Sequence, residues 1–279
     1  MSSASAIVSE PSTQGGFMKY AVCTGAVLAL CATAGVSLAA AAEHHHAAIP
    51  AYIEAAVNDS SRPENDRMRD VNRKPAEVLA FAGIKPGEKI GELMPAQGYY
   101  TRLLCRVVGD SGHVDTVNFQ MHMPPPAPGA PARPRRQMPA PAPLGCNNVT
   151  PSTQAAGDLM LPSGLDVVWT TENYHDFHNA MLGSPDMKAF DTAIYNALKP
   201  GGEFIVEDHA AAAGTGTQDT NTLHRIDPAQ VKREVEAVGF KFVGQSNVLH
   251  NPNDKHTELV FKMADKTDRF LFKFRKPGG

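Results

Sequence analysis

Two apolar patterns alternate along the chain from residue 89 to residue 274. Short apolar runs, typical of buried strands, lie at residues 89–93, 113–117, 165–170, 203–207, 241–245 and 269–274, with a further short run near Asn148. Between them, apolar residues recur every three or four positions, as on one face of a helix. Strands that alternate with helices favour an α/β fold. The sequence therefore predicts a doubly wound, mostly parallel, seven-stranded sheet.

Proline, glycine and capping residues indicate where the helices should begin and end. Residues 50–83 have a helical pattern, in which Pro75 begins a helix and Gly83 ends one. Two apolar stripes at helical spacing should face the sheet; they are Tyr100, Leu103, Leu104, Val107 and Val108, and Met187, Phe190, Ile194, Ala197 and Leu198. The run Lys-Pro-Gly-Gly at 199–202 should end the second of these helices. A last helix should begin at Asp227, with Gln230 at the spacing of a capping box.

The N-terminal segment has the pattern of an export signal. Lys19 is followed by an uncharged stretch, residues 20–42, that ends in small residues before Glu43. A positive start, an apolar stretch and a small-residue exit are typical of a secretory signal peptide. We expect residues 1–42 to be removed, with Met18 as an alternative start, and residues 43–279 to be exported to the periplasm. A retained membrane anchor is the alternative.

Residues 121–145 form a Pro-rich insertion. They hold nine of the 22 prolines and show no apolar period, so we expect an extended surface loop. After signal removal the remaining cysteines are Cys105 and Cys146. In an oxidising compartment the two can pair, and otherwise they stay free thiols.

The charge balance of the chain limits the classes of molecule that we expect it to bind. The chain has 26 Lys and Arg residues against 29 Asp and Glu residues, a formal net charge of -3. Binding to nucleic acid relies on a basic surface. We therefore expect a small-molecule substrate, no nucleic acid and no stable membrane insertion after cleavage. The oligomeric state stays open.

Polar side chains gather after the predicted strands, at the edge where doubly wound sheets bind ligands. These side chains are His175, Asp176 and His178 after the fourth strand, Asp208 and His209 after the fifth, and His224 and Arg225 before the next helix. Three interpretations are open. A His or Asp acts as a general base while Arg225 holds an anionic substrate; or His175, His209 and His224 bind a metal with Asp176 or Asp208 in support; or the group is a structural hydrogen-bond network.

An ordered set of motifs resembles the class I S-adenosylmethionine-dependent methyltransferases, most closely the exported methyltransferases predicted in bacteria. The motifs are the acidic strand end and turn at 92–100, Gly157-Asp158, Leu165–Trp169, Leu198–Gly202, Asn173–Asp176, Asp208-His209, 222–227 and 273–277. The resemblance covers residues 49–277.

The resemblance implies a cofactor site built from Glu92, Gly98, Tyr99, Asn118, Asp158 and Thr171. Glu92 matches the acidic residue of the first motif, Asp158 matches the acid beside the adenine, and Thr171 lies where methyl group and substrate meet. The sequence departs from the family where the glycines of the turn would be, at Met94, Ala96 and Gln97, and Asn118 replaces the ribose-binding acid.

Taken together, these motifs predict an S-adenosylmethionine-dependent methyltransferase that acts on a small molecule, with His175, Asp176, His209, His224 and Arg225 as catalytic residues. The alternative is an exported protein of the same fold that transfers no methyl group. Such a protein would bind a metal or another small ligand through its His and Asp side chains.

Overall fold

A seven-stranded sheet forms the centre of the protein in a computed structural model that describes residues 48–122 and 142–278. The strands are β1 (Lys89–Leu93), β2 (His113–Phe119), β3 (Val149–Gln154), β4 (Leu165–Thr171), β5 (Leu198–His209), β6 (Lys241–Ser246) and β7 (Arg269–Arg275). Their order is β3-β2-β1-β4-β5-β7-β6, and β7 runs antiparallel to both of its neighbours. The predicted doubly wound, mostly parallel, seven-stranded sheet is confirmed.

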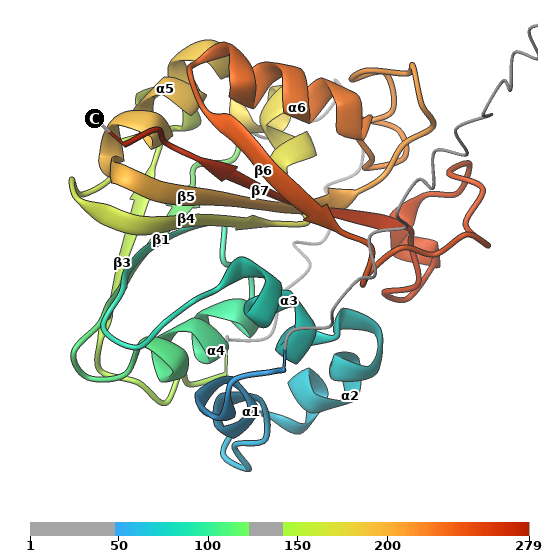
Figure 1. Ribbon diagram of the computed structural model, residues 1–279. Helices are drawn as coiled ribbons and strands as arrows, with labels where there is room; N and C mark the ends of the chain where they lie inside the picture. The colour runs from blue at the N-terminus through green and yellow to red at the C-terminus, as the bar shows by residue number, and fades with distance from the viewer. Residues whose placement is uncertain (1–47, 123–141, 279) are drawn as a thin grey trace, which may run out of the picture. The chain divides into compact units, whose positions relative to one another are not determined.

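Helices cover the two faces of this sheet (Figure 1). The helices α1 (Ala51–Val57), α2 (Glu64–Arg73), α3 (Pro75–Ala82) and α4 (Tyr99–Val108) lie on one side, and α5 (Met187–Ala197) and α6 (Pro228–Ala237) lie on the other. The strands β1, β2, β4, β5 and β7 contribute to both cores because their side chains alternate between faces. In β1, for example, Ile90 packs with the α1, α3 and α4 residues, whereas Leu93 packs with those of α5 and α6.

Most predicted elements lie within a few residues of the observed ones, and two expectations were wrong in detail. The run at 199–202 does not separate a helix from a strand, because β5 already begins at Leu198, which pairs with Leu165. The β4–β5 register shifts between Leu165 and Val167. Gln230 does not complete a capping box: Asp227 accepts from the N–H of Ala229, but the Gln230 amide donates to Glu234.

Cys105 and Cys146 form a disulfide, so the alternative of two free thiols is excluded. The bond joins α4 to the segment that leads into β3. Arg106 strengthens the same junction, since its guanidinium donates to the carbonyl of Leu144 at 2.9 Å. The C-terminal end of the Pro-rich insertion is therefore fixed to α4. The rest of the insertion, residues 123–141, and the predicted signal segment, residues 1–42, lie outside the described residues.

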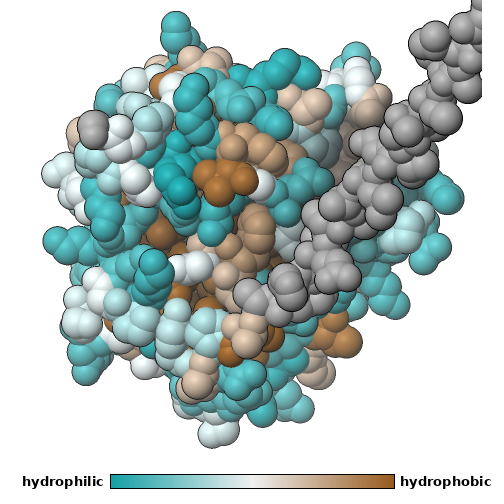
Figure 2. Space-filling view, in the orientation of Figure 1, coloured by the Kyte–Doolittle hydropathy of each residue, from teal (hydrophilic) through white to brown (hydrophobic). Residues whose placement is uncertain are grey.

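The surface of the described residues carries both hydrophobic and hydrophilic side chains. On the face seen in Figure 2, hydrophobic residues gather toward the middle and hydrophilic residues surround them. Within residues 48–122 and 142–278, no helix has the length and apolar character needed to cross a membrane.

Candidate functional site

A pocket of about 430 Å³ lies at the edge of the sheet where β4 and β5 end. Because β7 is antiparallel, the segment that precedes it also reaches this edge. The lining residues come from all three places, from α2 and from the segments that follow β1 and β2. They include His175, Asp176, His209, His224, Glu172, Asp265, Thr267, Arg69, Phe261, Met94, Met121 and Met181. The structure thus brings four of the five predicted catalytic residues into one pocket.

The most deeply buried of these four is His175, in the short 3-10 helix η2 (Tyr174–His178) that follows β4. Its backbone N–H and its ring Nδ1 contact the two carboxylate oxygens of Asp208, each at 2.8 Å. Burial lowers the pKa of His175, but Asp208 and Asp176 outweigh burial and raise it to about 10. Asp208 therefore fixes the orientation of the ring and stabilises its positive charge.

His224 and Asp176 complete a compact group with His175. Nε2 of His175 lies 3.2 Å from Nδ1 of His224 and 3.3 Å from Oδ1 of Asp176, and the last two atoms are 3.4 Å apart. Asn179 also donates to Oδ1 of Asp176, at 3.1 Å. Burial raises the pKa of Asp176, but its hydrogen bonds with His175 and His224 dominate and hold that pKa well below its usual range. Asp176 is thus an ionised carboxylate between two imidazoles.

His209 lies in the same pocket but outside this group. Its Nδ1 contacts the hydroxyl of Thr267 at 2.8 Å. Burial lowers its pKa to about 4, although Glu172 and Asp208 act in the opposite direction. His209 is therefore a neutral imidazole near pH 7. The predicted set of three histidines is not assembled, since the group contains Asp176 in place of His209.

A buried ion-pair network, which the sequence did not predict, reaches the pocket through Glu172. Arg269 at the start of β7 donates to Glu172 at 2.8 Å and to Glu207 at 3.0 Å. Arg73 of α2 also pairs with Glu172. No local sequence pattern indicated this network, because Arg269 is returned to the edge that carries the histidines by the antiparallel direction of β7, which only the structure shows.

The fifth predicted catalytic residue, Arg225, does not face a substrate. Its side chain is fully buried and its guanidinium pairs with Asp254 at 2.8 Å. It also donates to the carbonyls of Ala210 and Glu258. These contacts use both ends of the guanidinium, so the expectation that Arg225 holds an anion is corrected. Arg225 joins the end of β5 to the loop before β7.

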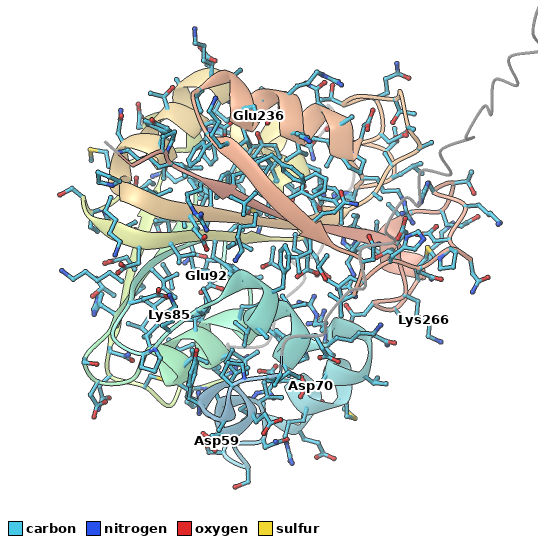
Figure 3. The ribbon with its side chains drawn as sticks, in the orientation of Figure 1. Asp59, Asp70, Lys85, Glu92, Glu236 and Lys266 are labelled. Atoms are coloured by element: carbon cyan, nitrogen blue, oxygen red, sulfur yellow. A yellow bond between two sulfur atoms is a disulfide. The ribbon has the colours of Figure 1, made fainter. Side chains whose placement is uncertain are left out.

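Two predicted cofactor residues point into the protein instead of into a pocket. Glu92 is 3% exposed and accepts a hydrogen bond of 2.6 Å from Thr101. Burial raises the pKa of Glu92 to about 7, with Thr101 and Arg102 acting against it. Tyr99 is also buried, and its hydroxyl donates to Asp70 of α2 at 2.6 Å. Figure 3 shows Glu92 at the sheet and Asp70 in the helical layer of α1–α4.

The turn between β1 and α4 keeps the backbone of a glycine-rich turn without most of its glycines. Met94, Ala96 and Gly98 have φ angles of 53°, 50° and 77°. Such values are uncommon for residues with a Cβ. The Asn173 side chain donates to the carbonyl of Met94 at 3.1 Å and so holds the turn against the end of β4. Met94 itself lines the pocket with the histidines.

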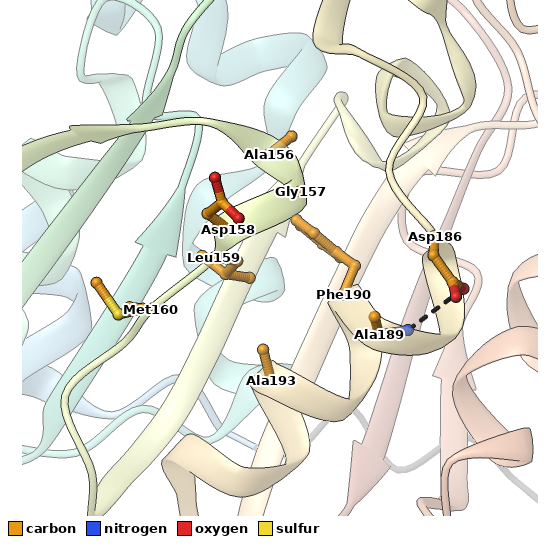
Figure 4. Close-up of a pocket in the computed structure, with 9 residues that line it drawn as sticks. All are labelled: Ala156, Gly157, Asp158, Leu159, Met160, Asp186, Ala189, Phe190 and Ala193. Atoms are coloured by element: carbon orange, nitrogen blue, oxygen red, sulfur yellow. Dashed lines mark hydrogen bonds between the residues drawn. The ribbon is translucent and has the colours of Figure 1, made fainter.

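The remaining predicted cofactor residues are spread over the same edge. Thr171 ends β4, and its hydroxyl accepts from the indole N–H of Trp169. Asn118 is half-buried on β2, beside Thr153 of β3. Asp158 is exposed and lines a different pocket of about 260 Å³, between the 3-10 helix η1 (Ala156–Asp158) and α5 (Figure 4). The structure therefore does not gather the predicted cofactor residues around one cavity.

The chain crosses this edge of the sheet directly after β2. The N–H of Gln120 bonds to the carbonyl of Gln154 at 2.9 Å, and the N–H of His122 bonds to the carbonyl of Met181 at 2.7 Å. Met181 follows β4, and β1 lies between β2 and β4 in the sheet. Residues 120–122 therefore bridge the end of β1, beside the turn that contains Met94.

No protein-family model matches this sequence, and no curated protein matches it. Among solved structures, the chain is similar to an S-adenosylmethionine-dependent methyltransferase from Aquifex aeolicus (14% identity, 77% of this chain and 98% of that chain, TM-score 0.48). It is also similar to the N-methyltransferase NodS from Bradyrhizobium japonicum in complex with S-adenosyl-L-homocysteine (12%, 81% and 96%, 0.47). An arsenic(III) S-adenosylmethionine methyltransferase from Chlamydomonas reinhardtii is a third (15%, 82% and 74%, 0.47).

Proposed function

We propose that the protein transfers a methyl group from S-adenosylmethionine to a small molecule held in the pocket of His175, Asp176 and His224. The observation that carries this proposal is the position of Met94. This residue belongs to a turn with the backbone of a glycine-rich cofactor loop, and it also lines the pocket that contains the histidines. A donor bound along the turn would place its reactive end beside the histidines.

The backbone of the turn fits the methionine end of such a cofactor. When bound, the cofactor supplies an electrophilic methyl group. Glu92 and Tyr99 flank the turn and are buried, and they hydrogen-bond to Thr101 and Asp70. Asp158 is exposed beyond the same edge, where the adenine end is expected.

Side chains of the pocket accept the proton that the methyl acceptor loses and stabilise the resulting charge. The His224 side chain is 21% exposed and is the most accessible imidazole of the group, so it takes the proton that the acceptor loses. Asp176, held ionised, stabilises the resulting imidazolium at 3.4 Å. Asp208 keeps the His175 ring fixed, so that its Nε2 stays directed at His224.

We also propose that residues 43–279 are exported to the periplasm. The Cys105–Cys146 bond supports this proposal, since disulfides persist in oxidising compartments and are rare in the cytosol. Export separates the protein from the cytosol, where S-adenosylmethionine is made.

This separation favours a second candidate function, ligand binding without methyl transfer. Two observations support it: the Met94 and Ala96 side chains stand at glycine positions, and residues 120–122 bridge the end of β1. Either feature narrows the space along which a nucleoside could extend.

Calorimetry separates the two candidates. Purified, disulfide-bonded protein is titrated with S-adenosylmethionine and with S-adenosylhomocysteine. Methyl transfer predicts saturable binding of both with one site per chain. The absence of heat at millimolar ligand would remove the methyltransferase proposal and leave the ligand-binding one.

A further inference from the structure

We propose that His175, Asp176 and His224 form the binding site of a single divalent metal ion of the zinc class, with one coordination position open to the pocket. The proposal rests on the donor atoms of these three residues and on the groups behind them. It is independent of whether the protein uses S-adenosylmethionine.

The three donor atoms form a nearly equilateral triangle with sides of 3.2, 3.3 and 3.4 Å. In a tetrahedral zinc site, bonds of about 2.0–2.1 Å place neighbouring ligand atoms about 3.3 Å apart. The triangle therefore matches one face of such a tetrahedron without movement of the side chains. Two imidazoles and one carboxylate are also a ligand set found in catalytic zinc sites.

A second layer of contacts orients each of the buried ligands. Nδ1 of His175 contacts Asp208 at 2.8 Å, which leaves Nε2 as the atom directed at the metal position. The carboxylate–histidine–metal arrangement is the usual support of a metal-binding histidine. Asn179 donates to Asp176 at 3.1 Å and holds that carboxylate in place.

The fourth position of the tetrahedron has room for an exchangeable ligand. The three residues line the pocket of about 430 Å³, and Met94, Met121 and Met181 line it as well. No cysteine competes for the metal among the described residues, because Cys105 and Cys146 are paired with each other. The site is thus of the open, catalytic kind, which binds water or an oxygen or sulfur atom of a substrate.

A metal here changes the chemistry assigned to the pocket. A hydroxyl or thiol bound to a divalent cation loses its proton near neutral pH. The cation would then promote deprotonation of the acceptor in place of His224, and the acceptor would bind to the cation as an anion. In the absence of a metal, the same three residues share protons through hydrogen bonds. A metal that binds Nε2 of His175 displaces the proton on that atom, which is released to solvent, so the two states exclude each other.

The test measures metal stoichiometry in the full chain. All proteins compared carry His44, His45 and His46 replaced by Ala, since a run of three imidazoles is itself a set of potential metal ligands, and no affinity tag of histidines is used. The protein is equilibrated with Zn²⁺, passed through a desalting column and assayed for zinc. We expect about one zinc per chain, and a tetrahedral Co²⁺ absorption spectrum after substitution with cobalt.

Two variants remove a ligand and one serves as a control. H224N is the first choice, because His224 has a φ of 55° and Asn tolerates that conformation better than most residues. H175Q is the second. The control is H250A, which removes a surface histidine that contacts Asp268 away from the pocket. Near-ultraviolet circular dichroism verifies that each variant is folded.

The expected result is a loss of at least tenfold in zinc content for H224N and H175Q, with H250A unchanged. The proposal is overturned if the parent binds no zinc, or if folded H224N and H175Q retain it. Because zinc content is measured without S-adenosylmethionine, this outcome is separate from that of the calorimetric test above.

Discussion

His175 is joined to Asp208 by two hydrogen bonds of 2.8 Å, one from its backbone N–H and one from its ring Nδ1. The carboxylate thus fixes both the start of η2 and the orientation of the ring. Asp208 is the next-to-last residue of β5, an interior strand of the sheet, and is itself fully buried. The most deeply buried histidine of the pocket is therefore attached to an interior strand of the sheet.

The variant D208N is expected to weaken zinc binding by about 10- to 100-fold, the usual cost of losing the group behind a metal-binding histidine. An amide of the same shape still accepts one hydrogen bond but no longer supports the charge of the ring. Zinc affinity is measured by competition with a chromophoric chelator. An affinity within twofold of the parent would contradict the assigned role, and H250A is the matched control.

The substitution E92Q should change how stability depends on pH. Burial raises the pKa of Glu92 from 4.5 to about 7, so the folded protein holds a proton that the unfolded chain releases. This contribution is complete below about pH 4.5 and disappears as the pH rises through about 7. Relative to the parent, E92Q should therefore gain stability between pH 5 and pH 8, by up to about 3 kcal/mol. Urea unfolding at several pH values measures the difference, and a gap that stays constant with pH would refute it.

Reduction of the Cys105–Cys146 disulfide should destabilise the protein by about 4 kcal/mol, since it opens a loop of 41 residues. Denaturant unfolding with and without a reducing agent measures the loss. The double variant C105S/C146S should show the lower stability from the start and no response to the reductant. Equal stability of oxidised and reduced parent would contradict the expectation.

The variant M94G should bind S-adenosylhomocysteine roughly tenfold more tightly than the parent, which corresponds to about 1.4 kcal/mol. Glycine adopts the positive φ of this turn without a steric cost and removes a side chain from the cofactor path. Calorimetry compares the two proteins. Unchanged or weaker binding would show that Met94 is not the obstacle, and the bridge at residues 120–122 would be the next candidate.

Replacing Arg225 should affect stability and leave the pocket intact. R225M leaves the Asp254 carboxylate buried without its partner, which typically costs about 3–5 kcal/mol. The double variant R225M/D254N should recover part of this loss because no buried charge remains. Thermal unfolding measures both, and zinc content per folded chain should match that of the parent. A selective loss of zinc with normal stability would restore a role in the site.

Local patterns were sufficient to predict the fold. The apolar runs of β1 and β4 and the stripe on α4 follow from periodicity, which depends on neighbouring residues alone. The start of β5 was missed because Pro200, Gly201 and Gly202 usually interrupt regular secondary structure. Here they lie within β5, next to a shift in the β4–β5 register.

The site was predicted only in part, for a physical reason. His175, Asp176, His209 and His224 follow strands or precede a helix, and strand ends meet at one edge, so their convergence could be expected. The roles of Arg225 and Glu172 depend on partners in loops far along the sequence, namely Asp254 and Arg269. No local pattern identifies such pairs. Whether a charged side chain faces a ligand or a buried partner of opposite charge depends on its surroundings in the folded protein.

The place of β7 in the sheet has a consequence for synthesis and for genetic damage. This strand follows β6 in the sequence, yet it lies between β5 and β6, and β6 pairs with no other strand among the described residues. A nascent chain therefore cannot add β6 to the sheet until residues 269–275 have been synthesised. A premature stop codon shortly before residue 269 would detach two strands instead of one and would also remove Arg269, the partner of Glu172 and Glu207.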